Sequence, residues 1–227
     1  MNAVLQSFLD RLPAPERSTF LGLRNPQAVQ EYLDSLPYIA EERDRSPLAL
    51  MTDRQAHCLD GGFFAALALR QIGFPPLVID LVPEPGADDD HVLAVFRIDG
   101  LWGALAKSNF TGLGYREPVY RSLRELAMSY FEDYYNYQRQ RTLRGYTRPL
   151  DLTRFDACGW MWDEAGVAVL SRRLYAALPI ALLTPQAIAR LLPADERSFR
   201  AASMGTDFSW VYGMREEKPH PPPPGNG

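Results

Sequence analysis

The sequence predicts an α+β fold in which one buried helix packs against a small antiparallel sheet. The segment from Cys58 to Ile72 is rich in Ala, Leu and Phe on nearly all sides, which is typical of a buried helix. Two apolar runs bounded by turn residues, 77–82 and 91–98, are typical of interior strands. Asp99-Gly100 is a strong hairpin signal, so residues 101–106 should return as the partner of the second strand.

Length, composition and charge bound the kind of protein. The chain has 227 residues, which fits one large domain with appendages, and its 46% hydrophobic and 23% charged residues are ordinary for a globular protein. A net charge of -4 gives no reason to expect a nucleic-acid partner. Two cysteines are too few for a disulfide framework, and neither a signal peptide nor a membrane-spanning run is expected. We therefore predict a cytoplasmic protein with no membrane partner.

The chain divides into four predicted segments. Residues 1–45 form a helical lead-in whose helices end at prolines, and residues 46–136 form the core. Residues 137–215 are expected to be a C-terminal helical extension of the same domain. Residues 216–227 contain four consecutive prolines and should be a disordered or extended tail.

Two further segments carry specific expectations. Apolar spacing from Pro118 to Tyr134 predicts a long amphipathic helix. The basic segment from Tyr137 to Arg148 is expected to be a solvated loop or a set of partners for the acidic surface, and an anion or peptide-carboxylate site is the alternative. The sequence contains no P-loop, no dinucleotide fingerprint and no zinc spacing, so no cofactor or metal is predicted.

Cys58 is the candidate nucleophile, because it opens a buried helix whose N-terminal end favours a thiolate. His91 opens the second strand and is the expected base. His57 is a poor candidate, because neighbouring side chains diverge, and the charge of Asp60 should raise the thiol pKa. The alternative is an inert buried cysteine, since free cysteine is among the most often buried residue types.

The order of these features resembles the core of the transglutaminase-like superfamily of papain-like folds. The residues that carry the resemblance are Cys58, Leu69-Arg70-Gln71-Ile72-Gly73, His91, Asp99-Gly100 and Trp102, within about residues 46–110. The resemblance implies that 46–136 is a transglutaminase-like core with Cys-His-Asp chemistry. That chemistry is acyl transfer or amide hydrolysis through a thioester, on a peptide or small amide substrate.

The third residue of that chemistry departs from the family pattern. The family usually has an aspartate four residues after the hairpin tryptophan, where this sequence has Ala106. A two-residue turn pairs Ile98 with Leu101, and counting back places Ser108 opposite His91. Ser108 therefore fits the register, whereas Asn109 fits the chemistry of orienting a histidine. Asp80, in the preceding strand, is a third possibility.

Two supporting roles complete the predicted site. Gln55 could supply a side-chain amide to an oxyanion hole, and the alternative is a solvent-facing loop residue. Gly61 and Gly62 are expected to keep the first helical turn open to a substrate. The leading prediction is a thiol amidohydrolase or acyltransferase. The alternative, favoured by the alanine at position 106, is a catalytically degenerate member that serves as a binding or scaffold module.

Overall fold

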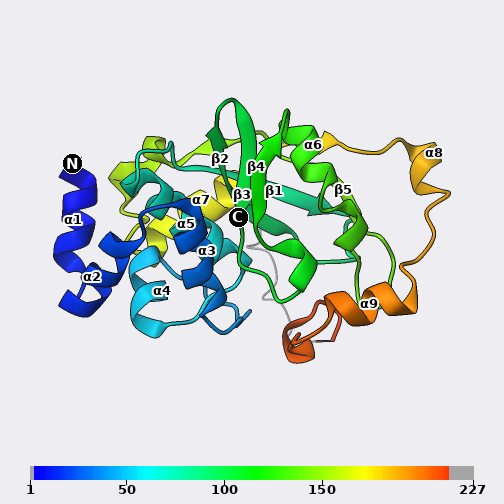
Figure 1. Ribbon diagram of the computed structural model, residues 1–227, viewed down its shortest axis with the longest axis horizontal. Helices are drawn as coiled ribbons and strands as arrows, with labels where there is room; N and C mark the ends of the chain where they lie inside the picture. The colour runs from blue at the N-terminus through cyan, green and yellow to red at the C-terminus, as the bar shows by residue number, and fades with distance from the viewer. Residues whose placement is uncertain (1–2, 215–227) are drawn as a thin grey trace, which may run out of the picture.

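The computed structural model describes residues 3–214, and in them helices surround a seven-stranded antiparallel sheet, so the predicted α+β class is confirmed (Figure 1). The strand order is β4-β3-β2-β1-β5-β7, with β6 paired to β1. The strands are β1 (Leu77–Pro83), β2 (His91–Ile98), β3 (Leu101–Leu105), β4 (Arg116–Tyr120), β5 (Leu143–Tyr146), β6 (Leu150–Asp151) and β7 (Ile180–Ala181).

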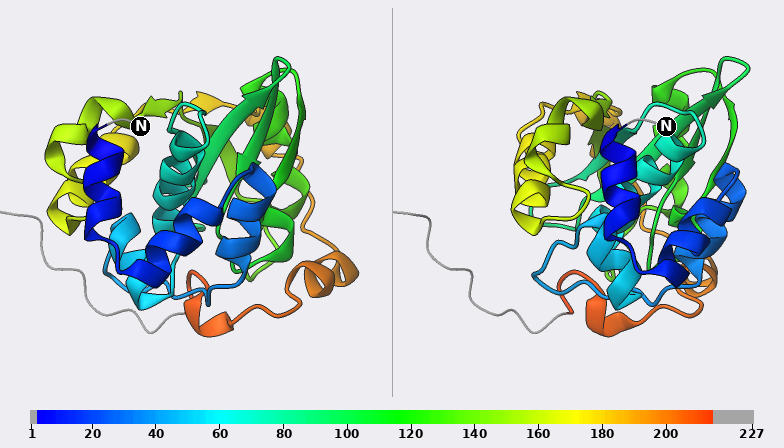
Figure 2. Two further views of the ribbon diagram at one scale, coloured as in Figure 1. Left: turned by 60° about the vertical axis from the view of Figure 1, so that its left-hand side comes forward. Right: turned by 90° about the vertical axis from the view of Figure 1, so that its left-hand side faces the viewer.

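The helices cover both faces of this sheet. Figure 2 shows α5 between the sheet and the N-terminal helices, while α6 packs on β3, β4 and β5. The α-helices are α1 (Ala3–Arg11), α2 (Ala14–Gly22), α3 (Pro26–Asp34), α4 (Pro47–Asp53), α5 (Cys58–Gln71), α6 (Leu123–Met128), α7 (Glu164–Tyr175), α8 (Pro185–Ile188) and α9 (Glu196–Ala202). No described helix is long and apolar enough to cross a membrane.

The sheet separates two hydrophobic cores, because successive strand side chains point to opposite faces. On β2, Val92 and Phe96 pack into the core that holds α5. Leu93 and Val95 pack into the other core, which holds α6. The predicted packing of the cysteine helix on an antiparallel sheet is thus confirmed, and β2 contacts α5 along most of its length.

Local sequence signals set the helix starts as predicted. Asn25 and Ser46 accept hydrogen bonds from the backbone N–H groups of Ala28 and Ala49, and a proline follows each cap. These caps satisfy donors that a helix N-terminus otherwise leaves unpaired. The buried helix α5 also begins at Cys58, as the apolar pattern predicts.

The hairpin after β2 has the predicted register but is shorter than expected. Asp99 and Gly100 have φ values of 49° and 83°, the left-handed backbone that a type I′ turn requires. Ile98 pairs with Leu101, and the ladder runs back to the pair Ala94–Leu105. Strand β3 ends at Leu105, so no ladder pair joins His91 to Ser108.

The long helix predicted from Pro118 to Tyr134 is wrong at its start. Residues Arg116–Tyr120 form strand β4, whose alternating burial shows a period of two residues. Ser122 then caps the short helix α6, which ends at Met128. Pro118 is tolerated because β4 lies at the edge of the sheet.

The segment 137–215 contributes strands as well as helices. Strands β5, β6 and β7 extend the sheet beyond the predicted core, while α7, α8 and α9 supply the expected helices. In Figure 1, α8 lies at the opposite end of the molecule from α1. The predicted Pro-rich tail, 216–227, lies outside the described residues.

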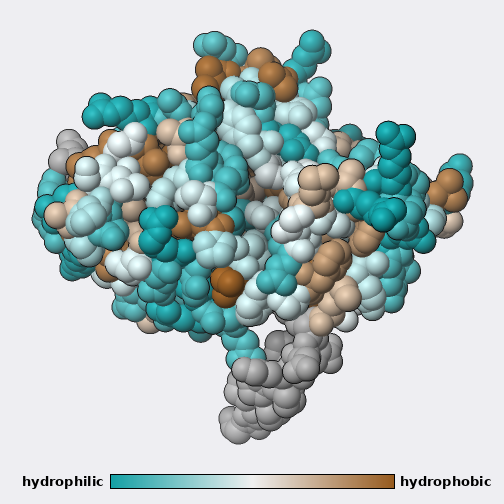
Figure 3. Space-filling view, turned by 60° about the horizontal axis from the view of Figure 1, so that its bottom comes forward, coloured by the Kyte–Doolittle hydropathy of each residue, from teal (hydrophilic) through white to brown (hydrophobic). Residues whose placement is uncertain are grey.

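The surface shown in Figure 3 is mixed in character. Hydrophobic side chains appear there as small separate patches among hydrophilic ones. Individual apolar side chains such as Leu178 and Leu192 are strongly exposed in the described chain. Scattered exposed apolar residues are normal for a globular protein, so this face does not by itself indicate a docking surface.

Candidate functional site

The thiol of Cys58 lies at the edge of a cavity of about 540 Å³. Cys58 is the first residue of α5 and is 9% exposed, and its Sγ lies 3.8 Å from the carbonyl oxygen of Asp90, toward which it donates. The cavity walls are acidic and aromatic, with the side chains of Glu41, Glu42, Asp44, Asp89, Asp90, Tyr38 and Tyr175. The thiol is therefore positioned to meet a molecule that enters from solvent.

Burial and the neighbouring His57 shift the pKa of this thiol in opposite directions. Burial raises the pKa of the Cys58 thiol, and the hydrogen bond and positive charge of His57 lower it. The nearby carboxylates of Asp90 and Asp89 raise it further. The net shift is upward, so a thiolate at this position depends on His57 to offset burial.

His57, which is not the predicted base, is the histidine that lies beside the thiol in the same cavity and lowers its pKa. It is the N-cap of α5, and its Nδ1 accepts a hydrogen bond from the backbone N–H of Leu59 at 3.2 Å. Its Nε2 lies 3.4 Å from Oδ1 of Asp44 and 3.3 Å from Oδ1 of Asp60. Burial lowers its pKa, but the hydrogen bonds to Asp44 and Cys58 and the charge of Asp60 raise it to about 10.

Asp60 completes a capping box with His57. One oxygen of the Asp60 carboxylate accepts from the backbone N–H of His57 at 3.2 Å, and the other accepts from the backbone N–H of Arg45 at 2.7 Å. The carboxylate is fully buried, which raises its pKa, while the charges of His57 and Arg45 lower it. An acidic residue three positions after a helix N-cap is the sequence signal that could have identified this pair.

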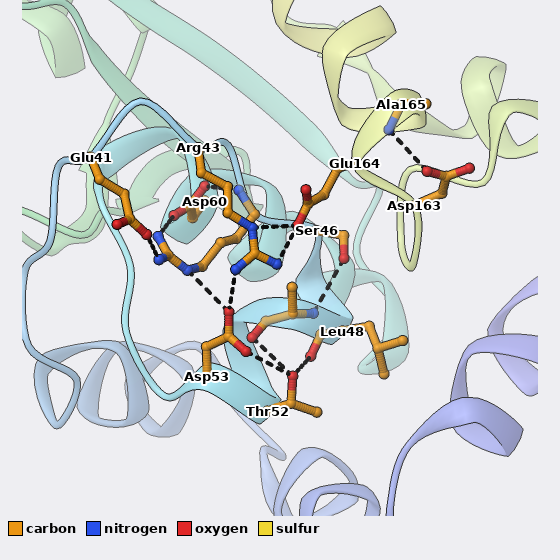
Figure 4. A network of polar contacts seen from close by, with 12 residues as sticks. Glu41, Arg43, Ser46, Leu48, Thr52, Asp53, Asp60, Asp163, Glu164 and Ala165 are labelled. Atoms are coloured by element: carbon orange, nitrogen blue, oxygen red, sulfur yellow. Dashed lines mark hydrogen bonds and ion pairs between the residues drawn. The ribbon is translucent and has the colours of Figure 1, made fainter. Parts of the chain in front are cut away.

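A network of ion pairs surrounds the start of α5, and Figure 4 shows its labelled members. The fully buried Arg45 side chain pairs with Glu41, with Asp53 at 3.4 Å and with Asp60 at 3.6 Å. Arg43 joins Asp53 at 2.8 Å and also pairs with Glu164 of α7. The network connects the 41–46 loop, α4, α5 and α7 around the cysteine.

His91 does not lie where the predicted base should. Its side chain lies on the same face of β2 as that of Leu93, in the core that holds α6. Its Nε2 lies 2.8 Å from the carbonyl oxygen of Leu113, and its ring packs edge-to-face against the rings of Tyr130 and Tyr134. Burial lowers its pKa to about 4. The predicted Cys58–His91 hydrogen bond does not occur among the described contacts, because the side chain of His91 belongs to the face of β2 opposite α5.

Ser108 and Asn109 line a second cavity, of about 50 Å³, together with His91, but neither orients it. The Oγ of Ser108 accepts from the backbone N–H of Phe110 at 2.9 Å. The Asn109 side chain donates to the carbonyl of Asp207 at 2.8 Å and accepts from its N–H at 3.1 Å. Both groups of the Asn109 amide are thus engaged by the C-terminal segment.

The remaining predicted residues also have other partners. Burial together with the charge of Asp90 raises the pKa of the Asp80 carboxyl, and a hydrogen bond from the backbone of His91 lowers it. Oδ1 of Asp80 is buried and has no hydrogen-bond partner in the described chain. Nε2 of Gln55 lies 3.5 Å from Oε1 of Glu41, which places its amide beside the Arg45 network.

Two further predictions concerned the glycines at the start of α5 and the basic segment 137–148. A side chain at Gly62 would lie 2.7 Å from Cγ1 of Val92, and one at Gly61 would clash with Lys107, so these glycines allow close packing of α5 and do not open the turn to a substrate.

Three arginines of the basic segment pair with acidic residues, as the leading interpretation expects. The pairs are Arg139–Glu196, Arg141–Glu132 and Arg144–Glu84.

Comparisons with known proteins find likeness only at the level of structure. No family model matches the sequence, and no curated protein matches it. Legionella pneumophila LapG is similar with a TM-score of 0.35 and 14% identity, over 47% of this chain and 74% of that one. A candidate cysteine protease from Cytophaga hutchinsonii is similar with a TM-score of 0.35 and 17% identity, over 52% of this chain and 47% of that one. At these TM-scores the likeness carries no argument about function.

Proposed function

We propose that this chain is a cysteine-dependent amide hydrolase or acyl transferase with Cys58 as nucleophile and His57 as its proton partner. The supporting observation is that Cys58 and its neighbour His57 line one open cavity at the N-terminus of α5, where His57 lowers the pKa of the thiol. A thiol with an adjacent histidine at a helix N-terminus is an arrangement that activates cysteine nucleophiles. A peptide or small amide is the substrate class that fits this chemistry.

The proposed reaction moves one proton from the His57 ring to the leaving nitrogen. Because the pKa of His57 is raised to about 10, the proton shared by the pair rests on the His57 ring, and the Cys58 sulfur attacks the amide carbonyl carbon as a thiolate. When the C–N bond breaks, His57 gives the proton to the leaving nitrogen, and a thioester remains on Cys58. Water then cleaves the thioester in a hydrolase, or an amine accepts the acyl group in a transferase.

Backbone N–H groups at the start of α5 are suited to the negative charge that develops on the carbonyl oxygen. The N–H of Leu59 is held by Nδ1 of His57 while that nitrogen is unprotonated. Protonation of Nδ1 ends its ability to accept this hydrogen bond. The Leu59 N–H is then available to an oxyanion at the step that forms one.

A binding or scaffold module without catalysis is the second candidate. The net upward shift of the Cys58 pKa and the position of His91 on the other face of the sheet favour it. In that case the cavity would bind a partner, and the thiol would remain protonated at neutral pH. The two candidates differ in whether Cys58 forms an acyl adduct.

Acylation by p-nitrophenyl acetate tests the proposal. A Cys158→Ala protein leaves Cys58 as the sole thiol. Mass spectrometry should then find one acetyl group on Cys58, removable by hydroxylamine, at a rate above that of the urea-unfolded chain at the same pH. His57→Gln should slow this acetylation and His91→Gln should not. Acetylation no faster than in the unfolded chain would reject the enzyme in favour of the binding module.

A cytoplasmic location is part of the same proposal. Both Cys58 and Cys158 are free thiols, and a thiol nucleophile must stay reduced to react. Reducing compartments maintain that state. Fractionation of the cells that make the protein tests this expectation.

A further inference from the structure

We infer that Asp60 is the positioning residue that sets the ring of His57 for proton transfer, and that the buried Arg45 keeps Asp60 ionised. The inference rests on the proposed function, because it concerns how the thiol's histidine is held. It also replaces an expectation, since the aspartate that the sequence pattern placed at position 106 is an alanine. The carboxylate comes instead from the helix that carries the nucleophile.

Asp60 contacts His57 at two points. One carboxylate oxygen accepts from the backbone N–H of His57 at 3.2 Å, and the other lies 3.3 Å from Nε2 of the ring. An ordinary capping box needs only the first of these contacts. The second fixes the orientation of the ring, because it holds Nε2 beside a buried carboxylate.

Asp44 approaches the same nitrogen from the 41–46 loop. Its Oδ1 lies 3.4 Å from Nε2 of His57, and its side chain is 37% exposed, whereas Asp60 is fully buried. The ring nitrogen therefore lies between an exposed carboxylate and a buried one. The hydrogen bond to Asp44 raises the His57 pKa more than the charge of Asp60 does, but only Asp60 also accepts from the backbone N–H of His57 and so fixes the ring relative to α5.

A buried carboxylate needs compensation, and Arg45 supplies it. The backbone N–H of Arg45 donates to Asp60 at 2.7 Å, and Nη1 of Arg45 lies 3.6 Å from the same carboxylate. The Arg45 side chain is itself fully buried and is held by Glu41 and Asp53. An isolated buried ion is strongly unfavourable, so this paired arrangement keeps a negative charge beside His57.

Other charged groups also face His57 and contribute to its titration. Asp44 comes from the 41–46 loop, and Cys58 and Asp60 from α5 itself. Asp90 comes from the loop before β2 and is hydrogen-bonded to Tyr175 of α7. The test must therefore compare carboxylates that differ in whether they contact the His57 ring.

Three matched variants in the Cys158→Ala background make that comparison. Asp60→Asn and Asp44→Asn each remove one charge from Nε2 of His57, and Asp53→Asn removes a partner of Arg45 that does not touch the ring. NMR titration of the His57 ring and the pH profile of Cys58 acetylation are measured for each. We expect Asp44→Asn and Asp60→Asn both to lower the His57 pKa, but only Asp60→Asn, which also releases the ring from α5, to reduce acetylation at least tenfold, with Asp53→Asn closest to the parent.

The outcomes separate this inference from the proposed function. A folded Asp60→Asn protein whose His57 pKa and pH profile match those of Asp53→Asn would overturn the positioning role. If Asp60→Asn does not fold, the His57 pKa is read from the ring ¹⁵N shifts of the parent protein. A value at or below the usual ~6.5 would overturn the positioning role of Asp60. If Cys58 is not acetylated in any variant, the proposed function fails while the NMR arm still tests the hold of Asp60 on His57.

Discussion

Val92 of β2 packs against Gly62 of α5, and this contact determines which way His91 faces. A side chain at Gly62 would lie 2.7 Å from Cγ1 of Val92, so the helix and the strand are in direct contact there. Because side chains alternate along a strand, the residue before Val92 must point away from α5. The close approach that buries the cysteine helix therefore also separates His91 from Cys58.

Gly62→Ala should destabilise the protein by about 1–3 kcal/mol, the usual cost of inserting a methyl group into a packed interior. The added group has no room beside Val92. Urea unfolding followed by circular dichroism measures the change. Gly22→Ala is the matched control, because nothing lies within 4 Å of the added methyl at that position. A loss of stability as large for Gly22→Ala would show that the contact with Val92 is not the cause.

His57→Gln should make Cys58 harder to ionise. His57 lowers the thiol pKa through its charge and hydrogen bond, so its loss leaves burial and the carboxylates of Asp89 and Asp90 unopposed. The pH midpoint of iodoacetamide alkylation in a Cys158→Ala protein should move upward. His91→Gln is the comparison variant and should leave the midpoint in place. A downward or absent shift for His57→Gln would contradict the pairing of His57 with the thiol.

Stability at alkaline pH should depend on His57. Its pKa in the folded protein is about 10, above the usual ~6.5, so its charged form stabilises the fold. That contribution is fully present below pH ~6.5 and is lost as the pH rises through about 10. Urea midpoints between pH 6 and 10 should fall more steeply for the parent than for His57→Gln. Parallel slopes in the two proteins would show that His57 is not held as a cation.

Stability at acidic pH should depend on His91 with the opposite sign. Its pKa in the folded protein is about 4, because burial disfavours its charge. The neutral ring therefore favours the fold above pH ~6.5, and this contribution is lost as the pH falls toward 4. Between pH 7 and 4, stability should fall less for His91→Gln than for the parent. An unchanged acid slope would indicate that the His91 ring is solvated.

Short-range patterns predicted much of the fold. Apolar runs with turn residues at their ends identified β1 and β2, and the residues with positive φ at Asp99 and Gly100 set the hairpin register. The caps at Asn25 and Ser46 were also identified, because each acts within one turn of helix. Strand β4 was mistaken for helix since a short edge strand with a proline carries little periodicity.

The site was harder to predict, because its contacts join distant segments. Asn109 was proposed to orient His91, but its amide binds the backbone of Asp207, 98 residues later. The sequence predicts that the charge of Asp60 raises the thiol pKa, yet the Asp60 carboxylate also pairs with Arg45 and contacts the ring of His57. Neither relationship follows from spacing along the chain, since both depend on which loops meet at the end of the sheet.

The N-cap of α5 couples the hydrogen bonding of the helix end to the protonation of His57. Nδ1 of His57 closes the helix end by accepting the Leu59 N–H, which it can do only while that nitrogen carries no proton. Every proton transfer to that nitrogen must then open the helix end, and every return must close it. The end of α5 would thus change its hydrogen-bond pattern once per turnover, and amide exchange at Leu59 would report on the catalytic cycle itself.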